Sequence, residues 1–326
     1  PQPRPFVDVV GLEIGSGHPE GVPAVRVRKI GGRTELVAAG FLELPGELPL
    51  EPQAPGVPTQ TWTLPRAFQA PYAALAVTSP QGYLRHIAGP GDEEAENKHI
   101  PFRTVTRSFG PDLPTLKAGL PEYQAVWAAT RLPEGRPPTA CSLQVSAAAA
   151  INTFTASPLF QTLPDTTLIL FAFAGYTSLV AFHGAKLVLY REHPVGYGHI
   201  RTAISNEMRI GTELADSVLQ DTFIDPIPMI EPVLKPLFRQ VEISSDYLLR
   251  RRNCQVQQFF LCGLPSGAKY WASIFSRAIP QPLKTFHPFD GLLKAPRADP
   301  LPADIPAVEP YLMTALGAAR AALEDV

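Results

Sequence analysis

Residues 7–17 read VDVVGLEIGSG, a nearly continuous run of β-branched and apolar residues that ends in a serine flanked by two glycines. Such a run predicts a strand over Val7–Ile14 that is buried on both faces, and the glycines predict a turn directly after it. Two alternating segments follow, Ala24–Ile30 and Glu35–Leu42, and Gly31-Gly32 between them is a hairpin signal. The chain therefore opens with a strand, a glycine turn and a β-hairpin.

The same arrangement returns in the second half of the chain. A predicted buried strand, Thr167–Ala174, is followed by the small-residue turn Gly175-Tyr176-Thr177-Ser178 and by two strands, Ser178–Phe182 and Lys186–Glu192. Two such β-β-β units are typical of a duplicated domain, although hairpins are common and the repeat alone leaves chance recurrence open. Duplication predicts a protein with two lobes.

Composition agrees with two globular domains and excludes several classes of protein. With 326 residues, the chain is longer than a single ordinary domain. Of its residues 45% are hydrophobic and 18% are charged, as in globular proteins. The net charge of −2 argues against a nucleic-acid-binding protein. The 3 cysteines lack disulfide or zinc-site spacing, which favours a reducing compartment. Because no apolar run approaches the ~18 residues that span a bilayer, we expect a soluble, cytoplasmic protein without direct membrane insertion.

The region between the two repeated units differs from both. Residues 45–65 form a proline-rich connector, and Tyr72–Thr78 and Gly82–Ile87 are predicted to pair as strands. Leu116–Thr130 and the alanine-rich segment Ser142–Phe154 are predicted to be helices.

The second half contains most of the predicted helices. They span Ile200–Arg209, Thr212–Asp221, Met229–Arg252, Ala268–Arg277 and Tyr311–Leu323, with a buried strand over Gln255–Cys262. Pro232 and Pro236 are expected to interrupt the third helix. The run Arg250-Arg251-Arg252 is interpreted as its charged C-terminal end, which the helix dipole favours.

These segments, in this order, resemble the PilM-type actin-like proteins of type IV pilus assembly, which are related to platform proteins of type II secretion. Residues 9–16 (VVGLEIGS) resemble the opening phosphate motif of that family, and residues 180–187 (VAFHGAKL) with Pro194-Val195-Gly196 resemble the end of its second meander. Further matches are Glu242–Tyr247, residues 259–263, His287-Pro288-Phe289 and Ala315–Ala319. The resemblance implies an α/β, actin-like (ribonuclease H-like) duplicated two-lobed fold with an inserted α+β subdomain.

The resemblance also implies how the chain is divided. We expect a first-lobe meander at 1–60, an inserted, partner-binding subdomain at 61–138, a return helix at 139–162, a second-lobe meander at 163–205, a helical subdomain at 206–254 and the remainder with the closing helix at 255–326. The weakest match is the proline-rich region and the inserted subdomain.

An actin-like ATPase needs two glycine turns whose backbone N–H groups cradle phosphates, and carboxylates that hold magnesium. By resemblance, the residues of this nucleotide cleft are Glu13, Gly15, Ser16, Gly17, Gly175, Thr177, Gly196, Gly263 and Gly267. Glu13 stands where the family has aspartate, so its carboxylate would be displaced. The insertion His18–Pro23 lengthens the turn compared with the family.

Other positions depart further from the family pattern. Phe171-Ala172-Phe173 replaces the second acidic motif, Asp-Ile-Gly, and Ser142 and Gln144 replace acids ahead of the alanine-rich helix. Asp216 and Leu219 replace a Glu and a Lys on the base-side helix. Each lost electrostatic group typically removes ~2.7–4 kcal/mol of transition-state stabilisation. No other catalytic motif is present, so we expect a degenerate site, no hydrolysis and no required cofactor, with ATP and magnesium disfavoured.

The expected function is that of a non-catalytic cytoplasmic scaffold in a type IV pilus-like inner-membrane platform. The implied partner is the cytoplasmic N-terminal tail of a bitopic inner-membrane protein, which would hold the chain peripheral to the membrane. Candidate strand edges for docking are Tyr72–Thr78 and Gly82–Ile87. Alternatives are a functional actin-like ATPase or small-molecule kinase and a bacterial cytoskeletal filament protein, and a homo-oligomer is left open.

Overall fold

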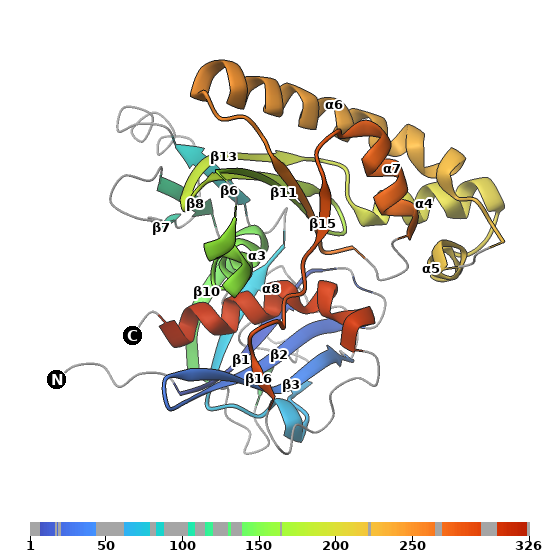
Figure 1. Ribbon diagram of the computed structural model, residues 1–326. Helices are drawn as coiled ribbons and strands as arrows, with labels where there is room; N and C mark the ends of the chain where they lie inside the picture. Colours follow the sequence, from blue (N-terminus) through green and yellow to red (C-terminus); the bar gives the residue numbers. More distant parts are fainter. Residues whose placement is uncertain are drawn as a thin grey trace.

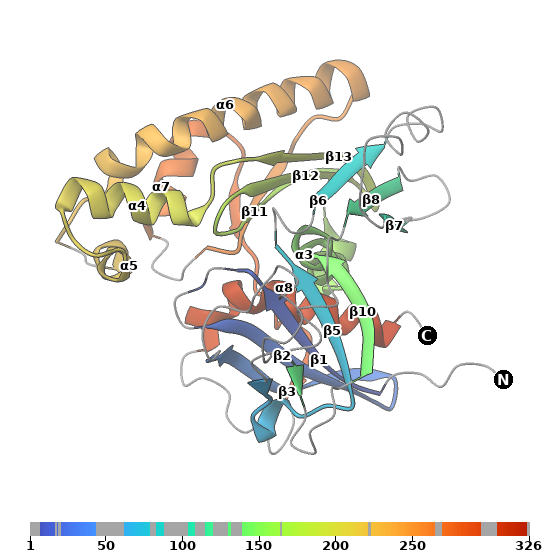
Figure 2. The same cartoon turned by 180° about the vertical axis from the view of Figure 1, so that it is seen from behind.

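Two β-sheets lie on opposite sides of a pair of central helices. The computed structural model describes residues 7–16, 18, 21–43, 62–78, 83–87, 104–107, 115–119, 130–131, 139–163, 165–220, 223–264, 269–294 and 305–324. Helices α3 (Ser146–Thr155) and α8 (Ile305–Glu324) lie between the sheets (Figures 1 and 2). The predicted Gly17 and Gly267 lie outside the described residues.

The first sheet has the strand order β10-β5-β1-β2-β3-β16. Its centre is the predicted antiparallel meander of β1 (Asp8–Ile14), β2 (Val22–Ile30) and β3 (Arg33–Leu42). On the other side of β1, β5 (Tyr72–Val77) and β10 (Thr139–Val145) continue the sheet in parallel. The short β16 (Leu293–Lys294) pairs with β3.

The second sheet repeats this order as β13-β12-β11-β14-β15. Strands β11 (Thr166–Ala172), β12 (Thr177–His183) and β13 (Lys186–His193) form the second meander, and β14 (Gln258–Cys262) and β15 (Leu283–Thr285) are parallel to β11. In both sheets the first strand of a meander pairs with a parallel strand on its other side. The predicted duplicated, two-lobed α/β fold is therefore confirmed.

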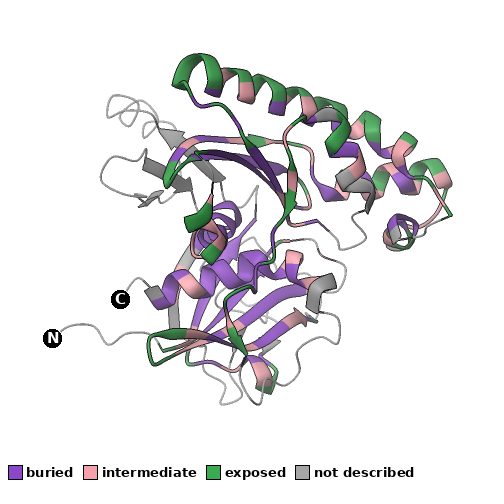
Figure 3. Cartoon of the chain, in the orientation of Figure 1, coloured by how far each residue is buried: buried purple, intermediate pink, exposed green. Residues whose placement is uncertain are grey.

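Two glycines allow α8 to pack closely against its neighbours. A Cβ atom at Gly11 in β1 would lie 1.9 Å from the carbonyl oxygen of Ala315 in α8, and one at Gly317 in α8 would lie 1.8 Å from that of Ala149 in α3. Real Cβ atoms do not approach backbone this closely, so both positions require glycine. Most of α3 and α8 is accordingly buried (Figure 3).

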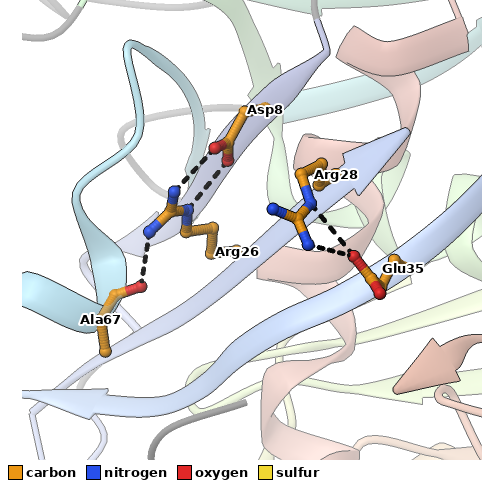
Figure 4. A network of polar contacts seen from close by, with 5 residues as sticks. All are labelled: Asp8, Arg26, Arg28, Glu35 and Ala67. Atoms are coloured by element: carbon orange, nitrogen blue, oxygen red, sulfur yellow. Dashed lines mark hydrogen bonds and ion pairs between the residues drawn. The ribbon is translucent and has the colours of Figure 1, made fainter. Parts of the chain in front are cut away.

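The face of the first sheet opposite α8 is covered by the segment that precedes β5. Leu64, Phe68 of the 3-10 helix η1 (Arg66–Phe68) and Ala70 pack there against β1 and β3 side chains. Arg26 on β2 fastens this cover, because its guanidinium binds both carboxylate oxygens of Asp8 at 2.9 and 2.7 Å and donates to the carbonyl of Ala67 at 3.1 Å (Figure 4).

Two predictions for the inserted region were wrong. Tyr72–Val77 does not pair with Tyr83–Ile87, because β5 lies between β1 and β10, whereas β6 (Tyr83–Ile87) pairs with β8 (Thr115–Gly119), which also pairs with β7 (Thr104–Arg107). The predicted helix over Leu116–Thr130 begins instead as β8, and Thr130 belongs to β9 (Thr130–Arg131), which pairs with β4 (Trp62–Thr63). Leu, Lys and Ala favour helices locally, but the cross-strand ladder decided this segment.

The alanine-rich helix was predicted to begin too early. Residues Ser142–Val145 complete β10 and pair with Ala74–Val77, and α3 starts at Ser146. The short segment η2 (Pro158–Thr162) follows the helix. Sheet pairing with a distant strand again outweighed local helix propensity.

Four helices belong to the second sheet: α4 (Tyr197–Met208), α5 (Thr212–Gln220), α6 (Ile227–Arg252) and α7 (Lys269–Ala278). Contrary to prediction, α6 continues through Pro232 and Pro236. Both prolines are exposed, so carbonyls that lose an N–H partner can face water. The arginine run forms the last turn of α6, as predicted. Within the described ranges, no helix combines the length and apolarity needed to cross a bilayer.

Candidate functional site

A cleft lies where the end of β1, the end of β11, the start of α4 and the middle of α8 meet. Of the predicted nucleotide-site residues, Glu13, Ser16 and Gly263 line it. The cavity volume of the cleft is about 70 Å³. Thr177 and Gly196 line a smaller apolar cavity behind the start of α4, and Gly175 is exposed at the turn.

Glu13 lies at the floor of the cleft and is 4% exposed. The hydroxyl of Thr78 donates to its carboxylate at 3.3 Å and lies 3.0 Å from the hydroxyl of Ser146. Burial raises the pKa of Glu13 to about 7, opposed by hydrogen bonds from Ser146, Thr78 and Thr314. This carboxyl is therefore held by hydroxyl groups from three elements: the end of β5, the start of α3 and the middle of α8.

The loop after β11 turns its carbonyl groups toward α4. The N–H groups of Tyr197 and Gly198 donate to the carbonyls of Phe173 and Ala174 at 2.9 and 2.7 Å. The N–H of Gly196 donates to Nδ1 of His199 at 3.1 Å, and the N–H of His199 donates to the carbonyl of Gly196 at 3.1 Å. The first amide donors of this helix, which could otherwise bind a phosphate, are thus satisfied within the protein.

Aromatic side chains fill the positions of the second acidic motif. Phe171 is fully buried in the core rather than in the cleft, with its ring 6.2 Å from that of Phe154. Phe173 lines the cleft and stacks on Tyr176, with ring centroids 4.6 Å apart. Gly263 has a φ of +81°, and a Cβ there would lie 2.4 Å from the carbonyl of Ala172. That glycine is required by the close approach of two strand ends.

The positions ahead of α3 that carry acids in the resembling family form a neutral hydrogen-bond chain. The amide of Asn152 donates to Gln144 at 2.7 Å, and the amide of Gln144 donates to the hydroxyl of Ser142 at 2.9 Å. Neither Ser142 nor Gln144 lines the cleft. Among the described residues there is no group of three or more His, Cys, Asp or Glu side chains that could hold a metal ion.

Four side chains that line the cleft, together with two that contact them, form a set that we call the mouth cluster: His18, Tyr197, Arg201 and Tyr311, with Phe41 and Asp216. His18 stacks on Phe41 at 4.2 Å and meets Tyr311 edge-on at 4.4 Å. Burial, and then the charge of Arg201, lower the pKa of His18 to about 4. The ring is therefore neutral at physiological pH.

On the α4 side of the mouth cluster, the hydroxyl of Tyr197 donates to Asp216. The guanidinium of Arg201 lies 3.4 Å from the other carboxylate oxygen of Asp216 and 5.7 Å from the centre of the Tyr197 ring. Asp216, which stands where the resembling family has a base-side glutamate, therefore belongs to an ion pair. Leu219 is buried in the core.

Residue patterns point to Asp216 and to the His18–Pro23 insertion, which carries the histidine into the cleft, but they do not predict the mouth cluster as a whole. Phe41 and Tyr311 come from a strand and a helix with no recognisable spacing between them, so only the folded arrangement brings them together.

Comparison with known proteins places the fold. The chain matches no protein-family profile and no curated protein sequence. Its structure is similar to that of a PilM–PilN type IV pilus biogenesis complex, with a TM-score of 0.71, 20% identity and coverage of 98% of this chain and 99% of the other. An archaeal actin homologue solved with ADP (TM-score 0.47, 13% identity, coverage 98% and 100%) and the ethanolamine utilization protein EutJ from Carboxydothermus hydrogenoformans (0.44, 12%, 98% and 90%) are more distant. The chain has the two-lobed actin-like fold of PilM.

Proposed function

We propose that this chain is a non-catalytic scaffold of a type IV pilus-like inner-membrane assembly platform, and that it acts by binding the cytoplasmic tail of a membrane protein. The observation that carries the proposal is the likeness, over 98% of the chain, to the structure of a PilM–PilN type IV pilus biogenesis complex. Because that neighbour is a complex of two proteins, binding a partner protein is the corresponding role for this chain.

The absence of catalysis is proposed from the chemistry of the cleft. A phosphate site needs backbone donors that point at the ligand, and here the first donors of α4 bind the loop after β11. Glu13 is the only carboxylate among the described residues that line the cleft, and its protonated form is favoured by burial. One carboxyl without a second acid is a poor magnesium site.

The partner's tail is proposed to dock on the inserted subdomain at 61–138, whose small sheet β6-β8-β7 is not hydrogen-bonded to either of the two main sheets. An extended peptide can add a strand to such a sheet. Through this partner the chain would be located at the cytoplasmic face of the inner membrane, without inserting itself.

Two measurements on the full chain test the proposal. Calorimetry with the N-terminal tail peptides of bitopic membrane proteins encoded beside this gene should give saturable binding to one of them. A thermal melt with Mg-ATP should leave Tm unchanged if no nucleotide binds. A bound ligand at 100 times its Kd would instead add ~2.7 kcal/mol to the free energy of unfolding and raise Tm. A rise of several degrees would instead favour the alternative of an actin-like ATPase or small-molecule kinase. Sedimentation of polymer would favour a filament protein.

A further inference from the structure

We propose that the mouth cluster is a latch that holds the two lobes closed without any nucleotide. The chain's own side chains supply, across the cleft, contacts that a bound ligand could otherwise provide. This inference concerns the conformation of the lobes and does not depend on the pilus role.

The two halves of the latch belong to different lobes. His18 follows β1, Phe41 lies in β3 and Tyr311 lies on α8, which packs on β1, β2 and β5 of the first sheet. Tyr197 and Arg201 lie on α4 and Asp216 on α5, and both helices belong to the second sheet's lobe, as Figures 1 and 2 show. Any contact between these two groups therefore joins the lobes.

Contacts run without a break from one group to the other. Phe41 stacks on His18, His18 meets Tyr311, and the ring of Tyr311 lies 6.2 Å from that of Tyr197, whose side chain it also hydrogen-bonds. Tyr197 then donates to Asp216, which Arg201 neutralises. Aromatic contacts of this kind each contribute ~0.5–1.5 kcal/mol beyond burial of their area.

Charge and packing both favour the closed arrangement. His18 is neutral at pH 7, so it does not repel Arg201 across the mouth. Below the latch, Val77 of the first lobe and Met313 of α8 belong to one hydrophobic cluster with Phe171 and Phe173 of the second lobe. The aromatic residues that replaced the second acidic motif therefore lie in a core shared by both lobes.

Distance measurement between the lobes tests the latch. Spin labels on cysteines introduced at Arg33, the exposed first residue of β3, and at Ser217, on the exposed side of α5, report the separation of the lobes. Cys141 is changed to Ser, whereas Cys254 and Cys262 are buried. We expect the full-length parent to give one narrow distance distribution that Mg-ATP does not change.

Tyr311→Ala should broaden this distribution and lengthen its mean, because it removes the ring that joins the two halves while alanine preserves helix α8. The matched control is Tyr247→Ala, which removes a half-buried tyrosine from α6, outside the cleft. It should leave the distribution unchanged.

A distribution in Tyr311→Ala identical to that of the parent would overturn the latch, and so would a broad parent distribution that Mg-ATP narrows. If Tyr311→Ala is not folded by circular dichroism, His18→Ala, in a loop, gives the same test with the same expected broadening. Binding of the partner's tail is measured separately on each variant. An unchanged distribution with retained tail binding therefore sinks the latch and leaves the scaffold role intact.

Discussion

The backbone N–H of Gly198 donates a hydrogen bond of 2.7 Å to the carbonyl oxygen of Ala174, and this bond joins the start of α4 to the loop after β11. The loop thus occupies the amide donors at the very place where a helix N-terminus could attract an anion. The contact depends on the absence of side chains, since Cβ atoms at Gly196 and Gly198 would lie 2.3 and 2.9 Å from carbonyl oxygens of the loop.

Gly196→Ala is expected to destabilise the protein by ~1–3 kcal/mol, because the added methyl group would collide with the backbone of Phe173, Ala174 and Tyr176. Urea unfolding followed by circular dichroism measures the effect. Gly175→Ala is the matched control in the same loop, because nothing lies within 4 Å of its Cβ position. Equal stability of the two variants would contradict the close packing of loop and helix.

Glu13→Gln is expected to change how stability depends on pH. The folded-state pKa is raised from 4.5 to about 7, so between these values the folded protein retains a proton that the unfolded chain releases. Glu13 therefore lowers stability as pH rises from 4.5 through 7, by an amount on the order of 3 kcal/mol at pH 8. The free energy of unfolding should be measured for both proteins at pH 5 and pH 8. Relative to the parent, Glu13→Gln should be more stable at pH 8 than at pH 5. Parallel pH profiles would show that this carboxyl is not buried as described.

His18→Phe is expected to change the pH dependence of stability in the opposite direction, because His18 lowers stability as the pH falls. The folded-state pKa of His18 is lowered from 6.5 to about 4, so the unfolded chain binds the proton first as pH falls. The stabilisation from the neutral ring is complete above 6.5 and is lost progressively toward pH 4. Phenylalanine keeps the stack on Phe41 and cannot titrate, so thermal melts at pH 4.5 and 7.5 should show a smaller acid-induced loss in the variant. An equal loss in both proteins would rule out a half-buried His18 that is kept neutral in the folded protein.

Asp8→Asn should lower the free energy of unfolding by ~1–3 kcal/mol, because it leaves the mostly buried Arg26 guanidinium without its carboxylate partner. The side chains of Arg26 and Asp8 are only 18% and 16% exposed. Asp246→Asn in α6 is the control, since its ion pair with Arg250 has exposures of 64% and 75% and such pairs contribute ~0–1 kcal/mol. Chemical denaturation of the two variants side by side should separate them, and similar losses would argue against a structural role for Arg26.

Much of the fold was accessible from residue patterns, because the deciding information is local. The β-branched run before Gly15 and the glycine-containing hairpins predict both meanders, and each one formed with its strands near the expected bounds. The errors fall where pairing is non-local: Leu116–Gly119 and Ser142–Val145 have helical composition, yet each forms hydrogen bonds with a strand distant in sequence.

The candidate site divides in the same way. Set against the resembling family, Phe171, Ser142 and Gln144 stand in place of acids, and this is enough to predict a cleft poor in carboxylates. Residue order carries no sign, however, that the donors of α4 bind the loop after β11, or that His18 and Tyr311 meet across the mouth. Those contacts depend on how two separately formed sheets pack around α8, and packing of surfaces that are far apart along the chain has no local pattern to announce it.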